Sequence, residues 1–138
     1  FINSETNTSV LPKAYDALRN FYRGAKDKTA EANTYRRYVD FMSGIQKESK
    51  SILNGYAWRM TELELNLGNA LERIDQAIDL FTENDGARDK AQIMDTKGEV
   101  LWKLGRIDEA VAVMDACIQL QPEDEYYQKQ KDKFLATS

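Results

Sequence analysis

Apolar residues recur every three or four positions along most of this chain, which is the spacing of one face of an α-helix. The first such face follows Pro12, a residue suited to the first turn of a helix. A second face runs from about residue 29 to residue 47. The pattern predicts a helix pair over residues 12–48, preceded by a polar lead-in at residues 1–11.

The same spacing continues to the end of the chain and predicts five more helices and no strand. Ser51, Asn69 and Asp108 stand where they could cap three of these helices. The last predicted helix, residues 123–135, has only four large apolar residues. They are Tyr126, Tyr127, Phe134 and Leu135. Such a helix is suited to the end of a stack, with its polar side in water.

Residues 91–124 have the pattern of a helix–turn–helix unit of 34 residues. Gly98 and Ala110 stand where two helix backbones approach closely, and Pro122 ends the second helix. A looser copy at residues 51–84 lies 40 residues upstream. There Trp58 falls at the place of Gly98, so Ala57 or Gly55 must allow the close approach, or the two helices splay. A repeat of this length predicts stacked helical hairpins, because one hairpin cannot bury its own apolar face.

These residues resemble the tetratricopeptide repeat, whose pattern has Gly, Ala, an aromatic residue and Pro at fixed offsets. Gly98, Ala110, Met114 and Pro122 occupy those offsets, although Met94, Lys97 and Leu101 replace the family's Trp, Leu and Tyr. The resemblance implies an all-α protein of about seven helices, with antiparallel hairpins stacked as a short α-solenoid. Residues 12–138 would form one helical domain, with a degenerate repeat at 51–84, a good repeat at 91–124 and a capping helix at 123–135. Residues 12–48 are either a third repeat or an unrelated pair.

The resemblance also implies a concave groove, lined by the first helix of each hairpin, that holds a peptide or a partner helix. Carried over by alignment, the candidate partner-binding residues are Arg59, Glu62, Leu63, Asp95, Glu99, Trp102 and Lys103. Trp102 is either an exposed anchor in this groove or a residue packed against its neighbours. The acidic side chains predict a neutral or basic partner.

Charge is unevenly distributed along the chain. Residues 1–50 carry a net charge of +3 and residues 51–138 a net charge of −7. An acidic repeat region is unsuited to nucleic acid, which requires clustered cations. No apolar run reaches the ~20 residues that cross a bilayer, so no membrane is predicted among the partners. The basic side chains of the first half are expected to be solvated, or to dock on an acidic surface.

Residues capable of catalysis are scarce. The chain has no His, the commonest general base and metal ligand, and its single Cys excludes an internal disulfide and a cysteine zinc cluster. Cys117 lies on an apolar face and is expected to be a packing residue. No Gly-rich phosphate loop is present. We therefore predict a protein that is not an enzyme, with no catalytic residue, no metal and no cofactor.

The function predicted from the sequence is a non-catalytic module for protein–protein interaction. The alternative is a C-terminal helical appendage of a larger bacterial protein, such as a thioredoxin-type thiol-disulfide oxidoreductase whose redox domain lies outside this chain. Terminal helices could also pair two copies in a homodimer. A soluble protein of the cytoplasm or the bacterial periplasm fits the composition.

Overall fold

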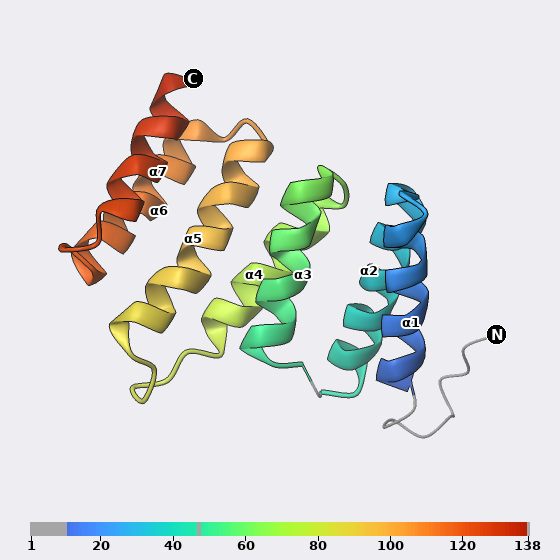
Figure 1. Ribbon diagram of the computed structural model, residues 1–138. Helices are drawn as coiled ribbons and strands as arrows, with labels where there is room; N and C mark the ends of the chain where they lie inside the picture. Colours follow the sequence, from blue (N-terminus) through green and yellow to red (C-terminus); the bar gives the residue numbers. More distant parts are fainter. Residues whose placement is uncertain (1–10, 47, 138) are drawn as a thin grey trace. The chain divides into compact units, whose positions relative to one another are not determined.

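The computed structural model describes residues 11–46 and 48–137, and all the regular structure in these ranges is helical (Figure 1). The helices are α1 (Leu11–Gly24), α2 (Lys28–Gly44), α3 (Lys50–Leu63), α4 (Leu67–Asp79), α5 (Ala87–Lys103), α6 (Ile107–Leu120) and α7 (Glu125–Ala136). The predicted all-α fold of about seven helices is thus confirmed. The predicted polar lead-in, apart from Leu11, lies outside the described residues.

The chain forms two compact units, residues 1–48 and residues 49–138. In the first unit α1 and α2 form an antiparallel hairpin. The rings of Tyr15 and Tyr38 lie 5.6 Å apart, and the guanidinium of Arg19 lies 4.2 Å from the centre of the Tyr35 ring. Asp27 caps α2 by accepting a hydrogen bond from the backbone N–H of Ala30 at 3.1 Å. Aromatic packing therefore joins the two helices of this unit.

The second unit stacks the hairpins α3/α4 and α5/α6 and ends in α7, which packs on α6 (Figure 1). Gly98 provides the close approach that its sequence position predicted. A Cβ atom added there would lie 2.5 Å from Cε of Met114, 3.4 Å from Cε2 of Phe134 and 3.8 Å from the carbonyl oxygen of Ala110. Glycine is the residue that fits this crossing without displacing a neighbour.

The hairpin α3/α4 is a repeat whose first helix has a different register. The buried residues of α3 are Leu53, Tyr56, Ala57, Met60, Thr61 and Leu63. Ala57 is fully buried whereas Gly55 is exposed, so Ala57 takes the place of Gly98 and the offset between the first helices is 41 residues rather than 40. The turn accommodates this shift, because both Glu64 and Asn66 adopt positive φ (56° and 52°). In the α5/α6 turn, Gly105 alone does so.

The predicted caps at Ser51, Asn69 and Asp108 are wrong, because the residues at the N-cap positions lie two or three residues earlier. Ser49 caps α3 by accepting a hydrogen bond from the backbone N–H of Ile52 at 3.1 Å. Asn69 lies inside α4, and its Oδ1 accepts a hydrogen bond from the hydroxyl of the buried Tyr56 at 2.6 Å. Asp108 lies within the first turn of α6, where its charge still suits the helix dipole.

The C-terminal helix α7 buries a different set of residues from the one predicted. Tyr127 and Phe134 are buried, but Tyr126 and Leu135 are 45% and 49% exposed. Gln130, which the pattern placed on the polar side, is buried against α5. A polar side chain of α7 therefore belongs to the interior, where it meets the acidic residues of α5.

Candidate functional site

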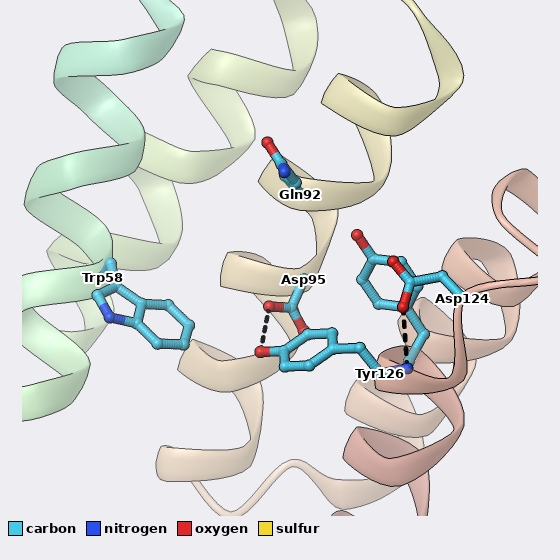
Figure 2. Close-up of a pocket in the computed structure, with 6 residues that line it drawn as sticks. Trp58, Gln92, Asp95, Asp124 and Tyr126 are labelled. Atoms are coloured by element: carbon cyan, nitrogen blue, oxygen red, sulfur yellow. Dashed lines mark hydrogen bonds between the residues drawn. The ribbon is translucent and has the colours of Figure 1, made fainter.

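A hollow of about 350 Å³ lies between α3, α5 and the beginning of α7 in the second unit. It is lined by Trp58 from α3, Gln92 and Asp95 from α5, and Asp124, Tyr126 and Tyr127 at the start of α7. Figure 2 shows Trp58 pointing across the hollow toward Tyr126, with Asp95 beside the Tyr126 hydroxyl. Asp124 caps α7 by accepting a hydrogen bond from the backbone N–H of Tyr126 at 3.0 Å, which orients the first turn of this helix.

Asp95 is a buried carboxylate that lines this hollow, with 6% of its surface exposed. Its Oδ2 accepts a hydrogen bond from the hydroxyl of Tyr126 at 3.0 Å, and its Oδ1 accepts one from Nε2 of Gln130 at 2.9 Å. Burial raises the pKa of Asp95 above its ordinary value, although the bonds from Gln130 and Tyr126 act in the opposite direction. Burial and the neighbouring Asp95 carboxylate in turn raise the pKa of Tyr126, so its hydroxyl keeps the proton that it donates.

Glu99, one turn further along α5, is a second buried acid. Nε2 of Gln130 also donates to Oε1 of Glu99 at 2.8 Å, and Nζ of Lys133 forms an ion pair with the same oxygen. Tyr126, Gln130 and Lys133 follow one another along one side of α7, so they form a polar row against α5. Of these two buried carboxylates, Glu99 forms an ion pair with Lys133, whereas Asp95 forms none with a described residue.

A second hollow of about 350 Å³ adjoins the first, because Gln92 lines both. Its other lining residues are Lys50, Ser51, Asn54, Asp85, Asp89 and Ile93. Lys50 forms an ion pair with Asp85, and hydrogen bonds from Lys50 and the backbone of Thr82 lower the pKa of that carboxyl. Within the described residues, the buried Oδ1 of Asn54 has no hydrogen-bond partner. The two hollows therefore lie side by side along the first helices of the two hairpins, with Gln92 in the lining of both.

The structure brings only Asp95, of the candidate groove residues from the sequence, to the lining of these hollows. Glu99 lies beside it, beneath Gln130 and Lys133. Arg59 forms an ion pair with Glu62 along α3 at 3.1 Å, and Leu63 is buried. These three residues of α3 do not line either hollow.

Trp102 and Lys103 lie at the other end of α5. The indole of Trp102 stacks on Phe134 with 5.4 Å between the ring centres, and its Nε1 donates a hydrogen bond to Oγ1 of Thr137 at 2.6 Å. Nζ of Lys133 and Nζ of Lys103 lie 4.4 Å and 4.9 Å from the centre of the indole ring. Trp102 is thus in contact with α7 on one side and with two cations.

Sequence reasoning missed Trp58, Gln92 and Tyr126 as site residues. The one-residue shift between the first helices explains why Trp58 was omitted. An offset of 40 residues aligns Trp58 with Gly98, whereas the offset of 41 residues aligns it with Glu99, which was a candidate groove residue. Matching small residue to small residue, Ala57 onto Gly98, would have found this shift from the sequence. Tyr126 comes from α7, and no pattern within the repeat points to it.

Comparison with known proteins identifies one segment of the chain. Residues 91–124 match the family model of the tetratricopeptide repeat, which is the span assigned to the good repeat from its residues. The resemblance is thereby confirmed for this segment: residues 91–124 form a tetratricopeptide repeat, which α5 and α6 make up. No curated protein and no solved structure matches the chain. The repeat and the helical fold are those of a protein-interaction module, in a family that is generally non-catalytic.

Other features of the described residues bear on chemistry. They contain no group of three or more His, Cys, Asp or Glu side chains that could hold a metal ion. No described helix is long and apolar enough to cross a membrane. Cys117 is fully buried, its Sγ donates a hydrogen bond to the carbonyl oxygen of Ala91 at 3.5 Å, and burial raises the pKa of its thiol to about 12. The prediction that Cys117 is a packing residue is confirmed.

Proposed function

We propose that this protein binds an extended segment of a partner protein on the surface formed by the two hollows along α3 and α5, here called the concave face. Its residues are Ser51, Asn54, Trp58, Gln92, Asp95 and Tyr126. The observation that carries the proposal is that the two hollows adjoin at Gln92, so one peptide can occupy both. Half-buried Asn54 and exposed Gln92 offer amide groups to a peptide backbone along this path.

The proposed partner segment is neutral or basic. Asp89, Asp95 and Asp124 line the two hollows and form no ion pair with a described residue. A carboxylate entering this field would be repelled, whereas a cation would be attracted. The proposed face therefore differs in detail from the groove inferred by alignment, but it keeps that groove's acidic character.

A substitution at the residue shared by both hollows tests the proposal. Gln92→Arg places a long cation on the path of the peptide, and Gln119→Arg makes the same change at an exposed position of α6 as the matched control. Partners cross-linked to the wild-type protein are identified, and the contacting segment is synthesised for calorimetry. We expect Gln92→Arg to weaken binding of that peptide at least tenfold and Gln119→Arg to leave it unchanged. Equal affinities for the three proteins would show that the partner uses another surface.

Two further proposals concern the context of the chain and are independent of the concave face. One is that it is the helical appendage of a larger bacterial protein, such as a thioredoxin-type oxidoreductase. The full reading frame tests this.

The other proposal is a homodimer that forms through the terminal helices. Light scattering over a concentration series tests it, and a constant monomeric mass would exclude it.

A further inference from the structure

We propose that the hollow between Trp58, Asp95 and Tyr126 is a specificity pocket for an arginine side chain of the bound partner. This inference rests on the proposed function, since it names the side chain that the concave face selects. The pocket combines three aromatic rings, those of Trp58, Tyr126 and Tyr127, with the buried carboxylate of Asp95. A cation is attracted to the face of an aromatic ring and forms charge-assisted hydrogen bonds with a carboxylate.

The aromatic part of the pocket includes the Trp58 ring, which contacts no other ring and no cation among the described residues. Trp58 is half-buried and projects into the hollow toward Tyr126 (Figure 2). The other tryptophan, Trp102, is already engaged by Phe134 and by two lysine ammonium groups. Trp58 has no such ring or cation contact with a described residue. The face of a tryptophan ring attracts a cation more strongly than that of any other side chain. Because the Trp58 ring has no cation beside it among the described residues, it favours a cationic ligand.

The electrostatic part of the pocket is a carboxylate that forms no ion pair with a described residue. The described groups that donate hydrogen bonds to the buried Asp95 are both neutral: the hydroxyl of Tyr126 and the amide of Gln130. Lys133, the cation whose charge acts on Asp95, forms its ion pair with Glu99. A carboxylate has about four acceptor positions, so each oxygen of Asp95 can accept one more hydrogen bond. Asp124 at the rim adds a further negative charge.

The shape and chemistry of the hollow favour arginine over lysine. A guanidinium is planar, so it can stack on an indole ring while its edge donates hydrogen bonds to a carboxylate, and it is less strongly hydrated than an ammonium. A volume of about 350 Å³ is ample for one such side chain. The adjoining hollow at Gln92 leaves room for the backbone that carries it.

Short peptides test the pocket directly. The probes are acetyl-Gly-Gly-Arg-Gly-Gly-amide and the same peptide with citrulline, which keeps the shape of arginine without its charge, or with lysine. Binding is followed through the two indole N–H signals in a ¹H–¹⁵N spectrum, where Trp102 serves as the internal reference. We expect a saturable shift of the Trp58 signal with the arginine peptide, affinity at least tenfold weaker with citrulline, and several-fold weaker with lysine.

Variants separate the two parts of the pocket. Trp58→Leu removes the ring and Asp95→Asn removes the charge, and each should weaken the arginine peptide at least fivefold. Asp79→Asn, the same charge change at an exposed position of α4, should have no effect. Circular dichroism verifies that each variant is folded, and Trp58→Leu tests the pocket even if Asp95→Asn unfolds the second unit. Equal affinity for arginine and citrulline, or for arginine and lysine, would overturn the proposal, as would a shift at Trp102 alone.

The pocket and the concave face can fail separately. Suppose that Gln92→Arg weakens binding of the partner peptide, whereas Trp58→Leu and Asp95→Asn bind it as tightly as the wild-type protein does. The arginine pocket is then wrong, and the proposal of the concave face stands. If the partner peptide binds Gln92→Arg normally, the concave face itself is wrong.

Discussion

Gly98 offers a quantitative test of how tightly α5 packs in the repeat. Replacing this glycine by alanine has two opposing effects. Alanine is favoured over glycine in a helix interior by about 1 kcal/mol. However, the new methyl group would lie 2.5 Å from Cε of Met114, the far end of a flexible but fully buried side chain, and 3.4 Å from Cε2 of Phe134. Met114 must therefore shift within a packed core, and overpacking of a core typically costs about 1–3 kcal/mol. We expect Gly98→Ala to lower the free energy of unfolding by up to about 2 kcal/mol.

The atom that limits this substitution can be identified because Met114 is the nearest neighbour. Met114→Leu removes the Cε methyl group and, as a nearly volume-conserving change, should cost less than about 1.5 kcal/mol. In that background Gly98→Ala should become stabilising, because the helix propensity of alanine remains while the closest contact is gone. The two substitutions should therefore show a coupling of about 1–2 kcal/mol in a double-mutant cycle.

Urea denaturation followed by helical circular dichroism measures the cycle. Gly68→Ala is the control, since a Cβ atom at this helical glycine would meet no atom within 4 Å. It should be neutral or stabilising by up to about 1 kcal/mol. A Gly98→Ala protein that is stabilised as much as the Gly68→Ala protein would refute the claim that the repeat closes around Gly98.

Three further predictions concern buried polar groups. Tyr56→Phe should destabilise the second unit by about 1 kcal/mol in urea denaturation, because it removes the hydroxyl that donates to Asn69. Asp95 has a raised pKa, so the folded protein binds its proton more tightly than the unfolded chain. Its contribution to stability therefore falls as the pH rises above its ordinary pKa of 3.8. The stability of Asp95→Asn relative to wild type should increase between pH 4 and pH 7, and a constant difference would contradict this assignment. Cys117, with a pKa of about 12, should react with iodoacetamide at pH 8 about a thousandfold more slowly in the native protein than in urea, as a mass-spectrometric time course would show.

Local pattern was sufficient for the helices and for the repeat. The spacing of apolar residues predicted seven helices, and the predicted bounds of the second and the last, residues 29–47 and 123–135, agree with α2 and α7 to within three residues. Gly98 and Ala110 could be recognised because the contact between the two helices of one hairpin recurs at fixed offsets within 34 residues. The helix starts were less accurate, since several polar residues near each start can act as the cap and only the backbone geometry selects one of them.

The contacts of the polar side chains between α5 and α7 could not be predicted from the sequence pattern. Asp95 and Glu99 were predicted to face a groove. Asp95 does line the hollow, but Gln130 of α7 donates hydrogen bonds to both acids, and Lys133 of α7 forms an ion pair with Glu99. These partners lie 31 to 35 residues away in sequence, and nothing in the periodicity of α7 distinguishes a buried Gln130 from a solvated one. The register of α3 was also hidden, because Glu64 and Asn66 adopt a left-handed conformation that few residues other than glycine take up.

The sequence by itself determined an all-α chain with a tetratricopeptide repeat at residues 91–124, because helix periodicity and close-packing residues are local properties. Only the tertiary structure decided which side chains meet at the site. Trp58, Asp95 and Tyr126 come from three helices. They lie together because the register of α3 is shifted by one residue and because α7 packs against α5. Those are consequences of the packing between helices, and the repeat pattern does not encode them.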